Sequence, residues 1–266
     1  MTHATPLLDH PAVSRRVFYP RFTTAVPNLS VDVGGCRLGC HLRRTHPGAG
    51  MVLYFHGNGE LASETDQFCG DMFTRAGVNV CFVEYRGYGA SDGQPALVAM
   101  LGDGESVVRA LGVSPERVVA FGRSLGSVYA IELAHRFPQL GGLILESGIA
   151  SVGSTWPLTQ EAKEIGCDPD ALANELATHF DHQAKLGGYR GPLLVLHALG
   201  DRHLDPTHGD RLHAWGGGAN KRFILFPHGN HNTIQLANLV EYTAAVEEFL
   251  RETGLTATLP VRPAPE

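Results

Sequence analysis

The chain has 266 residues, of which 43% are hydrophobic and 18% are charged, a composition that excludes a disordered polypeptide and allows one large domain or two small ones. Its 21 Lys and Arg against 27 Asp and Glu give a net charge of -6, so we do not expect nucleic acid as a partner. No apolar run reaches the roughly 20 residues needed to cross a bilayer, and the first residues lack the order of a signal peptide. We therefore expect a cytoplasmic protein without a transmembrane segment.

The predicted elements begin after a segment without a clear period, residues 1–18, which we expect to be loose. Residues 29–44 contain two strand-like halves around a pair of glycines, which predict an antiparallel hairpin at a sheet edge. From residue 51 onward, short aliphatic runs alternate with amphipathic helical patterns. The predicted strands cover residues 51–56, 78–84, 117–122, 142–146, 192–197 and 222–226. The predicted helices cover residues 60–76, 96–111, 125–137, 205–215 and 232–253.

This alternation predicts an α/β fold, in which helices cover both faces of a mostly parallel sheet within one domain over residues 19–254. Residues 147–186 interrupt the alternation and predict a small cap inserted between two strands. The apolar side chains of the cap either cover an acyl chain or pack the cap on the body, and the sequence leaves both interpretations open. These side chains are Trp156, Leu158, Ile165, Leu172, Leu176 and Phe180. The Pro-rich segment 255–266 is expected to be disordered.

Cysteine and histidine spacings do not predict a metal site. The closest pair of the five cysteines, Cys36 and Cys40, lies in the predicted hairpin, so we expect reduced thiols there and no zinc. His203, His208 and His213 follow one another at a spacing of five, which on a helix turns each side chain away from the last. We therefore expect neither a metal ion nor a cofactor.

The pattern Gly-x-Ser-x-Gly occurs twice, around Ser91 and around Ser124. A nucleophile elbow needs a strand that runs directly into a helix, with glycines where a side chain would collide in the tight turn. Residues 117–122 and 125–137 supply that strand and that helix around Ser124. Ser91 instead lies in a loop in which a glycine and a proline follow the serine, so no helix is expected to begin there. We therefore predict Ser124 as the nucleophile and Ser91 as a turn residue.

A serine hydroxyl needs a base, and the base needs an acid that orients it. Asp201 follows the predicted strand 192–197, and His231 follows the predicted strand 222–226. The side chains of Ser124, Asp201 and His231 therefore project from the carboxyl ends of parallel strands, where an open α/β sheet places its active site.

Other residues compete for two of these positions. Asp205 lies four residues past Asp201, although an aspartate followed by proline is typical of a helix start. Glu146 ends the preceding predicted strand, and His228 lies nearer its strand than His231 does. Asp205 and Glu146 therefore stay open as the acid, and His228 stays open as the base.

The segment His56-Gly57-Asn58-Gly59 follows the first strand of the predicted parallel sheet. Its glycines let backbone N–H groups approach the negative oxygen that develops on a substrate carbonyl. We predict that the amides of Asn58 and Leu125 form this oxyanion hole. The His56 ring is expected to hold the loop in place and not to transfer a proton.

Together these segments resemble the α/β-hydrolase superfamily of serine hydrolases, and within it the compact esterases and protein depalmitoylases. The resemblance covers about residues 50–250 and implies the α/β-hydrolase fold, with a triad in the chain order Ser, Asp, His. These families commonly have glycine after the histidine that precedes the acid, whereas Ala198 follows His197 here. The matching segments are Tyr54-Phe55-His56-Gly57-Asn58-Gly59, Glu84-Tyr85-Arg86-Gly87-Tyr88-Gly89-Ala90-Ser91, Phe121-Gly122-Arg123-Ser124-Leu125-Gly126-Ser127, His197-Ala198-Leu199-Gly200-Asp201 and Gly229-Asn230-His231-Asn232.

The predicted function is that of a serine hydrolase (EC 3.1) that cleaves a carboxylic ester or thioester through an acyl-enzyme on Ser124, with His231 as base and Asp201 as acid. The expected partner is a small-molecule ester, thioester or other acylated substrate. Alternatives are a peptidase or acyltransferase that uses the same triad, and a non-catalytic binding module. The acyl and alcohol or thiol specificity and the oligomeric state stay open.

Overall fold

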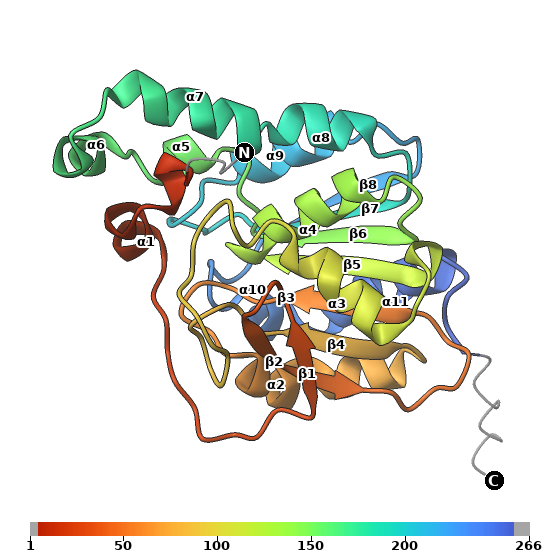
Figure 1. Cartoon of the computed structure of the whole chain (residues 1–266). Helices are drawn as coiled ribbons and strands as arrows, with labels where there is room; N and C mark the ends of the chain where they lie inside the picture. The colour runs from red at the N-terminus through yellow and green to blue at the C-terminus, as the bar shows by residue number, and fades with distance from the viewer. Residues whose placement is uncertain (1–4, 258–266) are drawn as a thin grey trace, which may run out of the picture.

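The computed structural model describes residues 5–257, which contain an eight-stranded sheet in the order β1-β2-β4-β3-β5-β6-β7-β8 (Figure 1). β1 pairs antiparallel with β2 and β2 with β4, and the other neighbours are parallel. The mostly parallel α/β architecture is therefore confirmed, and each strand predicted from residue 51 onward lies within one residue of its observed bounds. The strands are β1 (Leu29–Asp32), β2 (Arg37–Arg43), β3 (Met51–Phe55), β4 (Asn79–Val83), β5 (Val118–Arg123), β6 (Gly142–Glu146), β7 (Leu193–Ala198) and β8 (Lys221–Phe226).

Helices cover both faces of the sheet. The helices of the body are α2 (Ala62–Arg75), α3 (Asp103–Leu111), α4 (Gly126–Arg136), α9 (Thr207–Trp215), α10 (Ile234–Ala237) and α11 (Leu239–Glu252). Because side chains alternate along a strand, Leu53 and Phe55 of β3 join one buried cluster with α3 and α4. Val52 and Tyr54 join the opposite cluster with α2 and α11. Both faces of the central strands are therefore apolar, as the continuous hydrophobic runs of the sequence predict.

Two helices differ from their predicted extent. The helix predicted over 96–111 begins only at Asp103, because the residues before it form turns in which the Asp9 carboxylate accepts two backbone amides. The helix predicted over 232–253 is broken at Asn238, where the side-chain amide donates to the carbonyl four residues earlier at 2.7 Å. Side-chain contacts with the backbone thus set both boundaries.

The insertion forms a cap of four short helices that runs along the top of the view in Figure 1. They are α5 (Val152–Thr155), α6 (Thr159–Ile165), α7 (Pro169–His179) and α8 (His182–Gly188). Trp156, Leu172 and Phe180 are buried in the same cluster as the core of the body, and Lys185 of α8 donates to Glu132 of α4 at 2.5 Å. Most of the apolar cap side chains therefore pack the cap on the body.

The loose segment expected over residues 1–18 is not found in its described part, residues 5–18. Its elements are a short 3-10 helix η1 (Leu7–Asp9) and α1 (Pro11–Val17), which lie beside the cap in Figure 1. The Glu175 carboxylate of α7 accepts the amides of Leu7 and Leu8 at 2.9 and 3.0 Å. Val13 is fully buried. The segment is too short to show a period, and contacts distant in sequence hold it.

The C-terminal segment begins with ordered residues, since Gly50 donates to the Leu255 carbonyl and Ala257 donates to the Gly77 carbonyl, both at 2.7 Å. The rest of the tail predicted as disordered, 258–266, lies outside the described residues, as do residues 1–4. No described helix combines the length and hydropathy needed to cross a membrane. All five cysteines are free, and residues 5–257 contain no group of three or more His, Cys, Asp or Glu arranged to hold a metal ion.

Candidate active site

Ser124 lies at the tight turn between β5 and α4. Its φ is +50°, in the left-handed region that residues other than glycine rarely adopt. A Cβ on Gly126 would come within 2.0 Å of the Phe55 carbonyl oxygen, and a Cβ on Gly122 within 2.5 Å of the Ser127 Cα. Only glycine therefore fits on either side of this serine, because the turn packs directly against backbone.

Three side chains predicted as a triad meet at this turn. Ser124 Oγ lies 2.9 Å from His231 Nε2, and His231 Nδ1 lies 2.8 Å from Asp201 Oδ2. Because a carboxylate only accepts hydrogen bonds, Nδ1 carries the hydrogen and Nε2 accepts the bond from the Ser124 hydroxyl. The three residues come from the ends of β5, β7 and β8, so the parallel sheet places them at one edge.

The Asp201 carboxylate is held in place by backbone and side-chain donors. Its Oδ1 accepts the amides of His203 and Leu204, each at 2.9 Å, and its Oδ2 lies 3.3 Å from His197 Nε2. Burial acts to raise the pKa of Asp201, but hydrogen bonds from His197, His231 and the Leu204 amide lower it well below its usual range. Asp201 is therefore ionised throughout the ordinary pH range.

The residues that the sequence left open are engaged elsewhere. Asp205 is exposed, and its carboxylate accepts the amide two residues on, at the start of α9. Glu146 binds Arg123 at 3.0 Å through one oxygen and the Tyr242 hydroxyl through the other. His228 is exposed, and its carbonyl accepts a bond from an asparagine side chain. The hydrogen-bonded chain from Ser124 thus runs through His231 and Asp201.

Asn58 connects the loop after β3 to the N-terminal segment. Its Oδ1 accepts the Tyr19 amide at 3.0 Å and the Tyr88 hydroxyl at 2.8 Å, and its Nδ2 donates to the Val17 carbonyl at 2.5 Å. The main-chain amides of Asn58 and Leu125 donate to no other described residue. The two amides predicted for the oxyanion hole therefore have no acceptor among the described residues, and of the two residues Asn58 lines the cavity beside Ser124.

His56 stabilises the same loop from inside the protein. Its Nε2 lies 2.7 Å from Glu84 Oε1, and its Nδ1 lies 2.8 Å from the Gly57 carbonyl. Burial acts to lower the pKa of His56, but the Glu84 carboxylate outweighs it and the pKa is raised. Since both ring nitrogens face acceptors, His56 acts as a double donor that fixes the loop.

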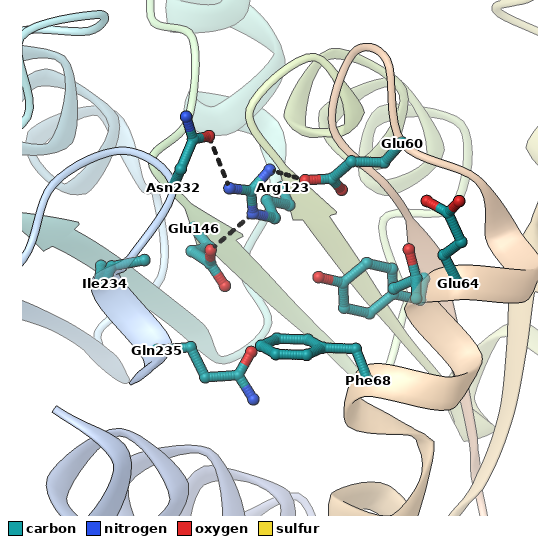
Figure 2. Close-up of a pocket in the computed structure, with 10 residues that line it drawn as sticks. Glu60, Glu64, Phe68, Arg123, Glu146, Asn232, Ile234 and Gln235 are labelled. Carbon is teal, nitrogen blue, oxygen red and sulfur yellow. Dashed lines mark hydrogen bonds and ion pairs between the residues drawn. The ribbon is translucent and has the colours of Figure 1, made fainter. Parts of the chain in front are cut away.

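Arg123 links three parts of the site, as Figure 2 shows. Its guanidinium binds Glu146 at 3.0 Å and also binds Glu60, as drawn in Figure 2. It also donates to the His231 carbonyl at 2.9 Å. Glu60 in turn accepts the Gly57 amide at 2.7 Å. Burial acts to lower the pKa of Arg123, but the two carboxylates raise it above its ordinary value. One buried cation thus ties the elbow, the loop after β3 and the His231 loop together.

Two cavities border Arg123. The larger, of about 430 Å³, is lined by Ser124 and His231, and we call it the catalytic cavity. The smaller, of about 190 Å³, lies towards Phe68 (Figure 2), and neither Ser124 nor His231 lines it. The other residues that line the catalytic cavity are Arg16, Tyr19, Asn58, Arg123, Ile149, Thr155, Trp156, His203, Leu204 and Asn232.

Sequence reasoning missed the contribution of the N-terminal segment to this cavity. Arg16 and Tyr19 line it, although both precede the first predicted strand. The sequence also gives little sign of the network around Arg123, which occupies a variable position of the Gly-x-Ser-x-Gly motif. A charged residue at that position, next to a predicted buried strand end, was the one available signal.

Comparison with known sequences finds relatives that match about two thirds of this chain. A family model described as "Serine aminopeptidase, S33" matches residues 46–166, which include Ser124 but neither Asp201 nor His231. The human alpha/beta hydrolase domain-containing protein 17B is 30% identical over 180 residues, which cover 66% of this chain and 58% of the human protein. Protein 17C of Xenopus tropicalis is 30% identical over 181 residues, which cover 66% of this chain and 54% of that protein. The chain thus spans little more than half the length of these curated relatives.

Solved structures of hydrolases share the fold. An esterase of Pyrococcus furiosus superposes with a TM-score of 0.69 at 15% identity and covers 89% of this chain and 98% of its own. A monoacylglycerol lipase of Paleococcus ferrophilus superposes with a TM-score of 0.66 at 20% identity, over 81% of this chain and 99% of the lipase chain. At these identities the likeness shows the fold alone.

Proposed function

Because the chain belongs to the α/β-hydrolase superfamily, we propose that it is a serine hydrolase that cleaves carboxylic ester or thioester bonds at Ser124. The observation that carries this proposal is the hydrogen-bonded chain from Ser124 Oγ through His231 to Asp201, with distances of 2.9 and 2.8 Å. A nucleophile, a base and an orienting acid in this order are the parts that acyl transfer needs.

In the first half-reaction, His231 Nε2 takes the proton of the Ser124 hydroxyl while Oγ attacks the substrate carbonyl. The ionised Asp201 keeps the Nδ1 hydrogen in place and stabilises the imidazolium that forms. The negative oxygen of the tetrahedral intermediate accepts hydrogen bonds from the amides of Asn58 and Leu125. His231 then gives its proton to the leaving alcohol or thiol, and an acyl-enzyme is left on Ser124.

In the second half-reaction, His231 removes a proton from water, which attacks the acyl carbonyl. As the second tetrahedral intermediate collapses, His231 gives this proton to Ser124 Oγ, the bond from Oγ to the acyl carbon breaks and the carboxylic acid is released. The same two amides stabilise both intermediates, and removal of one such donor typically costs about 3–4 kcal/mol in the transition state.

Covalent labelling of the purified protein tests the nucleophile directly. We expect a fluorophosphonate to label the peptide that contains Ser124 and to leave the peptide that contains Ser91 unlabelled. Turnover of p-nitrophenyl esters and acyl thioesters of increasing chain length, by the wild type and by Ser124→Ala, then defines the acyl preference. Full esterase activity in Ser124→Ala would overturn the proposal.

The base requires His231 to be neutral, so acidification should reduce activity. We expect kcat/KM for an ester to fall as the pH is lowered from about 8 to about 5. Asp201 does not cause this fall, because its lowered pKa keeps it ionised in that range. A flat profile over this interval in a protein that stays folded by circular dichroism would contradict the assignment of the base.

An aminopeptidase is the second candidate, favoured by the description of the matching family model. An enzyme that recognises a protonated α-amino group needs an acceptor for it, yet none of the described residues that line the catalytic cavity carries a carboxylate. We therefore expect amino-acid p-nitroanilides to be cleaved far more slowly than esters. Faster cleavage of the anilides would reverse this order.

A further inference from the structure

Among the described residues that line the catalytic cavity, those with a fixed charge are cationic. Of the described residues that line it, Arg16 and Arg123 carry fixed positive charge, and none carries a carboxylate. The charge of Arg123 is met by Glu60 and Glu146 in its own ion pairs. Of the two arginines, Arg16 therefore has the charge that is less neutralised by nearby carboxylates.

Arg16 keeps its hydrogen-bond donors unused among the described residues. Its side chain is 47% exposed, and its nearest acidic group, Glu161 of α6, lies 3.8 Å from Nε. That distance exceeds a hydrogen bond, and Glu161 does not line the cavity. The Glu161 Oε2 atom is itself buried without a partner in the described part of the chain. The pair thus supplies some charge compensation without fixing the guanidinium.

The surroundings of Arg16 leave one cationic corner in an otherwise mixed cavity. Ile149 and Trp156 supply apolar surface, and Thr155 supplies a hydroxyl. A guanidinium presents a planar fork of donors that matches a carboxylate or a phosphate in two parallel hydrogen bonds. An anion that enters the cavity would meet no lining carboxylate that repels it.

We infer that Arg16 is a specificity residue that binds an anionic group, a carboxylate or phosphate, of the ester or thioester substrate. This inference rests on the proposed function and adds to it the substrate class. The N-terminal segment is then part of the substrate site, since α1 carries the recognition group while the sheet carries Ser124. The anion belongs either to the acyl part or to the leaving group, and two pairs of substrates distinguish them.

The chain offers a matched control on the same helix. Arg15 is the neighbour of Arg16, and its guanidinium binds Glu164. It lines a separate cavity with Asp9 and Phe18 instead of the catalytic cavity. Arg15→Ala therefore changes the net charge by the same amount as Arg16→Ala without removing a group from the substrate site.

The first experiment compares kcat/KM of the full chain for anionic and neutral esters of similar size. Mono-4-nitrophenyl glutarate against 4-nitrophenyl butyrate tests an anionic acyl group, and 4-butyryloxybenzoate against its methyl ester tests an anionic leaving group. We expect Arg16→Ala to lower the anionic-to-neutral ratio about tenfold for one pair, mainly through KM, and Arg16→Lys to recover part of it. Arg15→Ala should keep the wild-type ratio. Equal ratios in the wild type and Arg16→Ala for both pairs, or an equal loss in Arg15→Ala, would overturn the inference.

The second experiment needs no turnover. Calorimetric titration of Ser124→Ala with mono-4-nitrophenyl glutarate and with 4-butyryloxybenzoate is compared with the same titrations of Ser124→Ala combined with Arg16→Ala. We expect about tenfold weaker binding of one of the two anions to the double variant. Equal affinities for both would reject the anion site even if the enzyme hydrolyses neutral esters. If the double variant binds an anion more weakly than Ser124→Ala does, but the wild type hydrolyses no ester, the proposed reaction would be rejected and the anion site kept.

Discussion

The two Gly-x-Ser-x-Gly segments share a pattern and differ in every physical feature that matters for chemistry. Ser124 lies between β5 and α4, and its Oγ is hydrogen-bonded to His231. Ser91 lies in a loop, and its Oγ accepts the Gly39 amide of β2 at 3.0 Å. The hydroxyl of Ser91 thus serves as an acceptor for the sheet edge, whereas that of Ser124 is directed at a base.

The glycines of the two segments differ in backbone conformation. Gly122 and Gly126 lie outside the left-handed region, and they are glycines because a Cβ would meet backbone atoms. Gly89 and Gly93 have φ values of +58° and +80°, so their own conformations favour glycine. In the elbow the unusual φ belongs to the serine itself. Strain at the serine, and not the spacing of the glycines, distinguishes the two segments.

Removal of the two serine hydroxyls, one at a time, should give the largest difference in kcat between the segments. We expect Ser124→Ala to lower kcat for an ester by about 10⁴-fold or more, because the nucleophile is lost. Ser91→Ala should change kcat less than about twofold, since its Oγ only supports the loop. Steady-state kinetics on both variants, with thermal unfolding as a check of folding, measures the contrast. A comparable loss in both variants would mean that the loop carries chemistry as well.

The arginines beside the two segments give the next contrast. Arg123→Met removes the cation that pairs with the buried Glu146 and the partly exposed Glu60, so we expect a loss of about 4 kcal/mol in unfolding free energy and a lower kcat. Arg37, which pairs with Asp92 of the second segment, is exposed, and Arg37→Ala should leave both unfolding and kcat unchanged. Urea unfolding and ester kinetics check both variants. Partial recovery of kcat in Arg123→Lys, at unchanged KM, would identify a positioning role beyond stability.

A Cβ added to a glycine of each segment has a smaller effect on unfolding. In Gly126→Ala the new atom meets the Phe55 carbonyl at 2.0 Å, and neither strand nor helix can move away, so we expect a loss of about 3 kcal/mol. In Gly93→Ala the new atom meets only the end of one side chain, the buried Cys36 Sγ, at 2.8 Å, so we expect mainly the strain of the positive φ, about 1 kcal/mol. Denaturant unfolding of both variants gives the two values. Equal losses would show that the elbow turn is less rigid than its contacts imply.

The parts of the molecule that the sequence predicts are those with local signals. Each central strand is a short apolar run that ends in a loop, so its position and the placement of Asp201 and His231 after β7 and β8 follow from pattern and chain order. The elbow is recognisable because a strand and a helix flank Ser124 directly. The α/β fold is confirmed for the same reason.

The parts that the sequence does not predict depend on partners distant along the chain. Arg16 reaches the catalytic cavity because Glu175 and Asn58 hold the N-terminal segment, and neither contact leaves a periodic signal. The role of Arg123 depends on Glu60 and Glu146 meeting it at the sheet edge. Such ion pairs become visible only once the strands are placed beside one another.

The smallest expected effect is the difference in stability between a glycine and an alanine variant, which should have opposite signs at the two serines. At position 124, Ser124→Gly and Ser124→Ala both lack the hydroxyl, but only alanine keeps a Cβ at φ +50°. We therefore expect the glycine variant to be more stable than the alanine variant by about 1 kcal/mol. At position 91 the backbone is not in the left-handed region, so Ser91→Gly should be less stable than Ser91→Ala by about 0.5–1 kcal/mol, because glycine gains entropy in the unfolded chain. Urea unfolding of the four variants measures both differences, and a Ser124→Gly variant less stable than Ser124→Ala would show that the φ of Ser124 carries no strain.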